Sequence, residues 1–150
     1  MPTENSNEPT VDFLILADRA EAVNGKLYMM GGGWDHLYVV DFGQAQSVSF
    51  GMGILIPWNA TNVNHSLAIK VEGQDGNELA TLSLNFNTGR PPTLGQCESQ
   101  KVVLAFQLGL NLPGPGTYVI KAFINNTEKG KAVFYANLLP APTAAVPPSA

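Results

Sequence analysis

Apolar side chains recur at every second position between residues 46 and 57, and this period of two constrains the fold more than any other feature. Val48, Phe50 and Met52 are each followed by a serine or a glycine. Successive side chains of an extended strand point to opposite faces, so this run places one face on a core. The same alternation recurs over 67–71, 82–86, 102–110 and 118–124. The chain is therefore predicted to consist mainly of β-strands.

Turn-forming residues separate these runs where hairpins require them. Asn24-Gly25, Asp75-Gly76-Asn77 and the segment 125–131, which contains Gly130, each lie between two predicted strands. Asn-Gly and Asp-Gly tolerate the positive φ angles of tight hairpin turns. Residues 18–23 are the one weak helical candidate, and they are too few to matter. The pattern predicts an all-β fold, an antiparallel β-sandwich of seven to eight strands, Greek-key or immunoglobulin-like.

A tyrosine after a Pro/Gly-rich turn favours the immunoglobulin-like or Greek-key sandwich over a barrel. The run from Leu112 to Tyr118 is Leu-Pro-Gly-Pro-Gly-Thr-Tyr and leads into a predicted strand. A tyrosine corner has this form in sequence. The Cys…Trp…Cys framework of antibody domains is missing, because the chain has a single cysteine, Cys97.

The 150 residues fit one domain of ordinary size. Residues 1–10 are expected to form a polar tail, 11–138 the sandwich domain, and 139–150 a Pro/Ala-rich tail. No apolar stretch has the length that a membrane span requires, and the first residues lack the features of a secretory signal. We therefore expect a soluble protein in the cytoplasm, or within a particle assembled there, with no membrane partner.

Charge is sparse along the whole chain. Lys, Arg, Asp and Glu make up 13% of the residues, with a formal net charge of -4, whereas a typical soluble domain has about 25% charged residues. The few basic residues are scattered, which argues against nucleic acid as a partner. A surface this poor in charge favours contact with other protein surfaces.

The segment 17–34 carries a distinctive set of motifs. It contains Ala17-Asp18, then Gly25-Lys26-Leu27-Tyr28, then Gly31-Gly32-Gly33-Trp34. In these motifs the chain resembles a family of small uncharacterised bacterial proteins. The resemblance implies no activity, because that family has no established function.

The glycine run forms a candidate ligand or turn site that comprises Gly31, Gly32, Gly33, Trp34, Asp35 and His36. A phosphate-binding loop would carry Lys after its last glycine and open a helix, which this segment does not. A bulge, a crossing between the two sheets, or close backbone approach beneath a large ring such as Trp34 is the favoured interpretation. As an alternative, Trp34, Tyr38, Phe42 and Trp58 would form an aromatic platform for a sugar or another ligand.

Catalytic, metal and cofactor sites are not predicted. His36 and His65 are far apart, the segment around Cys97 has no base to activate its thiol, and no nucleophile elbow is present. Residues 72–78 are too few for a calcium loop and fit a hairpin turn instead. The chain is therefore not expected to be an enzyme; a metal-dependent or carbohydrate-active domain ranks last among the alternatives.

Two predicted strands present outward faces of small, nearly uncharged residues. These residues are Ser47, Ser49, Gly51 and Gly53 on 46–57, and Val103, Ala105 and Gln107 on 101–110. Exposed sheet surface normally carries charge or proline, so these faces are interpreted as an interaction surface covered by a partner or a second copy. Cover by the same chain, or a shifted assignment of the two faces, is the alternative.

The predicted function is a non-enzymatic structural or interaction module, an oligomer or a component of a larger assembly such as a virion. The alternative is a β-sandwich that binds a small molecule or a glycan.

Overall fold

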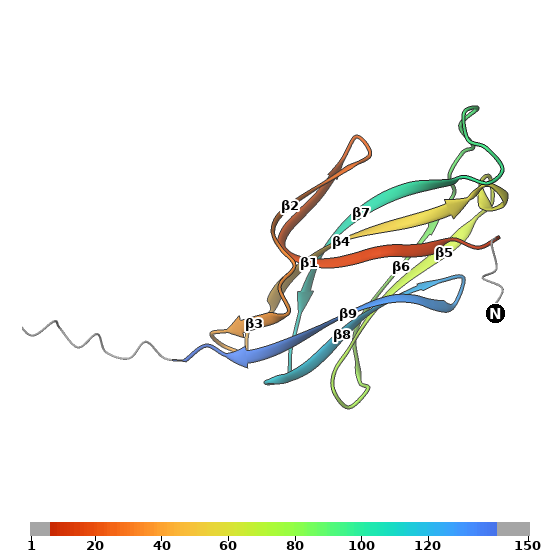
Figure 1. Cartoon of the computed structure of the whole chain (residues 1–150). Helices are drawn as coiled ribbons and strands as arrows, with labels where there is room; N and C mark the ends of the chain where they lie inside the picture. The colour runs from red at the N-terminus through yellow and green to blue at the C-terminus, as the bar shows by residue number, and fades with distance from the viewer. Residues whose placement is uncertain (1–6, 141–150) are drawn as a thin grey trace, which may run out of the picture.

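Two β-sheets make up the computed structural model, which describes residues 7–140 (Figure 1). One sheet has four strands and the other five, and the only helical element in this range is the single 3-10 turn Trp58–Ala60. The prediction of an all-β sandwich is confirmed. In spatial order the first sheet contains β2 (Lys26–Gly32), β1 (Thr10–Val23), β4 (Gln46–Pro57) and β7 (Ser99–Leu110), and the second contains β3 (His36–Val39), β9 (Thr127–Leu138), β8 (Gly116–Ile124), β5 (His65–Glu72) and β6 (Glu78–Phe86).

Strand β3 is an addition to the predicted set. It pairs with β9 in parallel, whereas the other strand pairs of residues 7–140 are antiparallel. Four residues are too few for an alternating pattern to be recognised in sequence. After β2 the chain crosses from one sheet to the other, and Tyr135 donates a backbone hydrogen bond to the Asp35 carbonyl at 2.8 Å.

The turn between β8 and β9 is shorter than predicted. Asn125 and Asn126 alone form it, with φ angles of 51° and 68°, and β9 begins at Thr127. Gly130 lies inside the strand, where an added Cβ would come within 2.9 Å of Val11 Cγ1 in the other sheet. This glycine therefore allows close packing of the sheets instead of a turn. Residues 18–23, the weak helical candidate, belong to β1.

The predicted turns at Asn24-Gly25 and Asp75-Gly76 are confirmed. Asn24 and Gly25 have φ angles of 50° and 73°, and Gly76 has 80°. In chain order, β1 begins at Thr10 and β9 ends at Leu138. Residues 1–6 and 141–150 of the two expected tails lie outside the described residues, so the tails remain a prediction.

The core lies between β4 of one sheet and β5, β8 and β9 of the other. Phe50, on the central strand β4, is fully buried, and its ring stacks on Phe106 at 5.1 Å between centroids. On β4, β5 and β8 the alternating apolar positions are buried, as the period of two predicts, whereas on β6 and along most of β7 they are half-buried or exposed. The largest fully buried side chains include Phe50, Phe134, Met52, Ile54, Ile69 and Ile120.

Tyr118 forms the predicted tyrosine corner. Its hydroxyl donates a hydrogen bond to the carbonyl of Gly114, four residues upstream in the Pro/Gly-rich turn. The buried ring stacks on Phe134, with 5.5 Å between centroids and 19° between planes. The corner ties the β7–β8 connection to the sandwich, as it does in immunoglobulin-like domains.

Candidate functional site

The outer face of β4, predicted to be an interaction surface, is covered by the chain itself. Ser49, Gly51 and Gly53 are buried. A Cβ added to Gly53 would lie 2.5 Å from the Phe13 ring, and one added to Gly51 would lie 2.6 Å from Leu27 Cδ2. Cover by the same chain, the alternative interpretation, therefore applies at Gly51 and Gly53, and these positions are not open to a partner. The residues are small because side chains of β1 and β2 pack directly on the backbone of β4.

The β1–β2 hairpin provides this cover. Figure 1 shows it turning away from the line of the other strands, and β2 lies against both β4 and β7. Tyr28 and Met30 alternate with Leu27 along β2 and therefore project from the opposite side, where they are 58% and 69% exposed. The hairpin thus buries one face against the sheet and presents the other to solvent.

The remaining predicted surface residues lie at the margin of the four-stranded sheet. Ser47 is exposed and accepts a hydrogen bond of 2.9 Å from the side chain of Gln107. Val103 and Ala105, on the edge strand β7, are half-buried. Part of the predicted surface is therefore accessible, but only on β7 and at the start of β4.

The predicted ligand or turn site forms one open pocket, here called the glycine pocket, with a volume of about 600 Å³. Asp35 is the one predicted member that does not line it, and its carboxylate accepts a 2.7 Å hydrogen bond from Nδ1 of His36. Asp18, Leu37 and Tyr38 join the lining from β1 and β3. The full lining is Asp18, Gly31, Gly32, Gly33, Trp34, His36, Leu37 and Tyr38.

Backbone conformation explains why glycines occupy this segment. Gly31 and Gly33 have φ angles of 61° and 91°, in the region that side chains rarely adopt. The Asp18 carboxylate also lies directly over Gly31, in the space that a Cβ would occupy. Gly33 donates a backbone hydrogen bond to the carbonyl of Leu16 at 2.7 Å, which anchors the turn to β1. At this turn the chain leaves the first sheet for the second, and the group that lies over Gly31 is a carboxylate and not a large ring. The turn also shapes the pocket.

Aromatic rings border the glycine pocket. Trp34 packs edge to face on Phe134 with 6.1 Å between centroids, and its buried Nε1 has no hydrogen-bond partner among residues 7–140. Tyr38 is 58% exposed. His36 lies 5.2 Å from the ring of Tyr135.

The predicted aromatic platform is therefore formed only in part. Trp34 and Tyr38 line the same pocket, whereas Phe42 packs against the core. Trp58 lies elsewhere, with the guanidinium carbon of Arg90 3.4 Å from its ring centroid.

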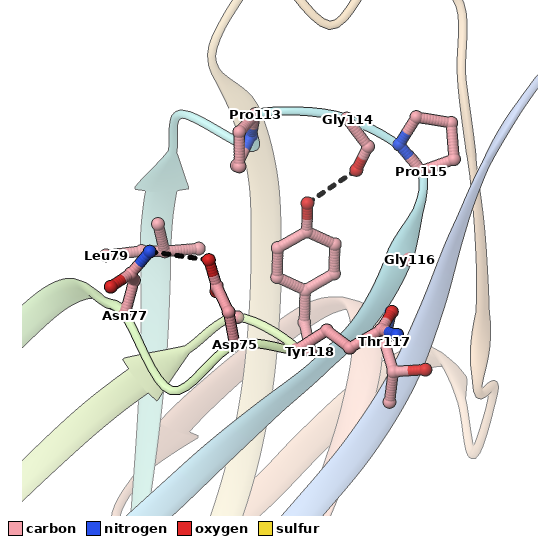
Figure 2. Close-up of a pocket in the computed structure, with 11 residues that line it drawn as sticks. Asp75, Asn77, Leu79, Pro113, Gly114, Pro115, Gly116, Thr117 and Tyr118 are labelled. Carbon is pink, nitrogen blue, oxygen red and sulfur yellow. Dashed lines mark hydrogen bonds between the residues drawn. The ribbon is translucent and has the colours of Figure 1, made fainter.

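A second hollow, here called the corner pocket, lies between the β5–β6 turn and the β7–β8 connection (Figure 2). Its volume is about 550 Å³, and Tyr118, Pro113 and Leu79 form its apolar part. On the polar side, Asn77 donates a 2.6 Å hydrogen bond to Asp75. In the sequence the β5–β6 turn and the β7–β8 connection are two separate turns, because only the pairing of the strands brings them together. Phe134 contacts both Tyr118 and Trp34, so the two pockets lie at one end of the sandwich.

The side chain of His65 has a structural role. Its Nε2 donates to the carbonyl of Ala60 at 2.8 Å, and its Nδ1 accepts from the Asn125 side chain at 3.0 Å. The Asn125 side-chain oxygen accepts from the backbone N–H of Ser66 at 3.0 Å. One ring nitrogen of this buried histidine thus joins the start of β5 to the β8–β9 turn, and the other joins it to the 3-10 turn at Ala60.

Lys121 lies outside both pockets and has a shifted pKa. A hydrogen bond to Glu72, with Nζ and Oε2 2.8 Å apart, raises the pKa of Lys121 above its ordinary value, and Glu128 at 3.7 Å adds to the effect.

Within residues 7–140, no cluster of three or more His, Cys, Asp or Glu side chains is placed to hold a metal ion. Over the same residues, no helix is long and apolar enough to cross a bilayer. Cys97 is exposed.

Comparison with known proteins places the chain by family. A model for a family of unknown function (DUF6941) matches residues 12–137. No curated protein matches the chain.

Three solved structures are similar at low sequence identity. The alkylpurine DNA glycosylase AlkC of Pseudomonas fluorescens, bound to DNA containing an abasic site analog, is 11% identical with a TM-score of 0.46, over 86% of this chain and 30% of that one. An immunoglobulin-like protein from Pseudomonas aeruginosa is 8% identical with a TM-score of 0.41, over 89% and 99%. A glycosyl hydrolase family 2 member from Bacteroides cellulosilyticus is 10% identical with a TM-score of 0.37, over 62% and 13%.

Proposed function

The chain belongs to the DUF6941 family, whose function is unknown, and from this premise we propose that it is a non-enzymatic interaction module that assembles with a second copy of itself through strand β6. One observation carries the proposal: β6 is a long edge strand almost without charge. Its nine residues contain one charged side chain, Glu78, at the start, and neither lysine nor proline. The edge strands of monomers normally carry lysine, other charged residues or proline, which prevent pairing with another chain.

The free edge of β6 is accessible. Within residues 7–140 the strand pairs with β5 along one side only. Thr81, Leu82 and Ser83 are exposed in succession at its centre. Their backbone groups on the open side are available to a further strand, which is the mode of recognition called β-augmentation.

If two copies of β6 pair about a two-fold axis, the side chains that face one another are compatible in polarity. In an antiparallel pair centred on Leu82, Ala80 faces Leu84 of the second copy and Thr81 faces Ser83. Leu82 is in register with the buried Ile69 of β5, so it points to the core side, yet it is 36% exposed. The two copies would therefore join their apolar inner faces, and Glu78 would face an apolar residue, Phe86, instead of another charge.

Strand β7 is the weaker candidate for this contact. It too is terminal in its sheet, but it carries Lys101, whose Nζ lies 2.8 Å from Asp12 Oδ2. The β1–β2 hairpin also lies against it. The alternative function, binding of a glycan or small molecule, would use the glycine pocket and not β6.

Light scattering coupled to size exclusion tests the proposal on the full chain. We expect the wild-type protein to be a dimer and the double variant Thr81→Lys/Ser83→Lys to be a monomer, because each new lysine would face one of the partner's. A matched control, Tyr28→Lys/Asn137→Lys, adds the same charge at exposed positions of β2 and β9 and should stay dimeric. A wild-type protein that is monomeric at high concentration, or a control that dissociates equally, would overturn the proposal.

A further inference from the structure

We propose that the glycine pocket binds a small organic ammonium ion, a function separate from assembly through β6. The pocket combines two aromatic rings, Trp34 and Tyr38, with one carboxylate, Asp18. A cation over an aromatic face is attracted by the negative charge of the ring, and recognition of alkylammonium groups uses such rings together.

The charges around the pocket indicate a positively charged ligand. Asp18 is the one acidic group in the lining, and no lysine or arginine lines the pocket. Asp35 is not part of the lining, and its carboxylate is bonded to His36. Asp18 forms no ion pair with any of the described residues. An anion would therefore meet a negative site, whereas a cation would find an available carboxylate.

The glycine turn leaves space for the carboxylate above its backbone. Asp18 lies over Gly31, whose positive φ and missing Cβ leave room for its oxygens. Trp34 is held by its edge-to-face contact with Phe134. A site whose polar and aromatic groups are already positioned loses less conformational entropy on binding.

Because the glycine pocket is open to solvent, we expect its ligand to be small and to bind with moderate affinity. Tyr38 is 58% exposed, so its ring is not enclosed and can be reached from solvent. The volume of about 600 Å³ accommodates a trimethylammonium group with a short substituent.

The test uses choline and its neutral isostere, 3,3-dimethylbutanol, in ¹⁵N NMR titrations of the full chain. The chain has two tryptophans, so the indole N–H signal of Trp34 reports on the pocket and that of Trp58, which is stacked against Arg90, serves as an internal control. We expect choline to shift the Trp34 signal in a saturable way and dimethylbutanol to bind roughly tenfold more weakly, because it lacks the charge.

Variants separate the pocket from general effects. Asp18→Asn keeps the shape and should weaken choline binding without changing the binding of dimethylbutanol, and Tyr38→Leu should weaken choline binding as well. The control Asp75→Asn removes a carboxylate from the corner pocket and should change nothing. None of these positions lies on β6, so each variant should keep the oligomeric state of the wild type.

Three outcomes would overturn the proposal. The first is no saturable shift with choline, and the second is equal affinity for choline and dimethylbutanol, which would indicate an apolar hollow only. The third is a shift of the Trp34 signal by methyl glucoside but not by choline, which would assign the pocket to a glycan.

Discussion

The side chain of Leu27 occupies the space directly above Gly51, so close that a Cβ added to the glycine would lie 2.6 Å from Leu27 Cδ2. This contact connects a hairpin strand to the central strand of the sheet. It explains why a glycine lies between Phe50 and Met52 on β4 and why the outer face of that strand is not a bare surface.

Replacing Gly51 should therefore destabilise the protein. In Gly51→Val the new side chain would overlap Leu27, and overpacking of this kind costs about 1–3 kcal/mol. Chemical denaturation monitored by circular dichroism measures the loss. Gly109→Val, on β7, is the control, because its Cβ would meet no atom within 4 Å. Equal losses in both variants would show that Leu27 is not the cause.

The Asn125 side chain should contribute more to stability than that of Asn126. Both residues have positive φ angles, of 51° and 68°, so alanine strains the backbone at either position. Only Asn125 also bonds to Ser66 and to the buried His65. Asn125→Ala should therefore be less stable than Asn126→Ala by about 1–3 kcal/mol, the cost of leaving buried polar groups unsatisfied. Equal midpoints of urea unfolding for the two variants would refute this role.

The Lys121–Glu72 pair should stabilise the protein at neutral pH and stop doing so in strong alkali. The pKa of Lys121 is raised above 10.5 by its hydrogen bond to Glu72. The folded state thus holds the proton more tightly than the unfolded chain, and the stabilisation is lost as pH rises from the ordinary lysine value through the folded-state pKa.

Comparison of the wild type with Lys121→Met isolates this effect from other groups that titrate in alkali. Lys70 and Lys131 flank Lys121 in register, and both are present in each protein. The difference in free energy of unfolding between the two proteins should be constant around neutral pH and should shrink above pH 10.5. A difference that stays constant throughout would contradict the assignment.

The sequence predicts those parts of the fold that local rules determine. The period of two along β4 identifies a strand with a core face, Asn24-Gly25 identifies a hairpin turn, and Tyr118 after a Pro/Gly-rich run identifies the tyrosine corner. Each depends on residues within a few positions of one another.

Features that depend on distant contacts could not be predicted in the same way. Gly51 and Gly53 have the same sequence signature whether a partner or the chain's own Leu27 and Phe13 cover them. Gly130 resembles a turn residue until Val11 of the other sheet is seen against it. The predicted site included Trp34 and His36 of the glycine pocket. It did not include Asp18, which lines the same pocket from β1.

Disulfide trapping at Leu82 tests the central claim, assembly through β6, most directly. In a Leu82→Cys/Cys97→Ser variant, two copies paired about Leu82 place their new cysteines face to face. Mild oxidation should then yield a covalent dimer, whereas Ala105→Cys/Cys97→Ser, with its cysteine on β7, should remain largely monomeric on a non-reducing gel. Failure of the Leu82 variant to cross-link, or equal cross-linking at position 105, would contradict the account.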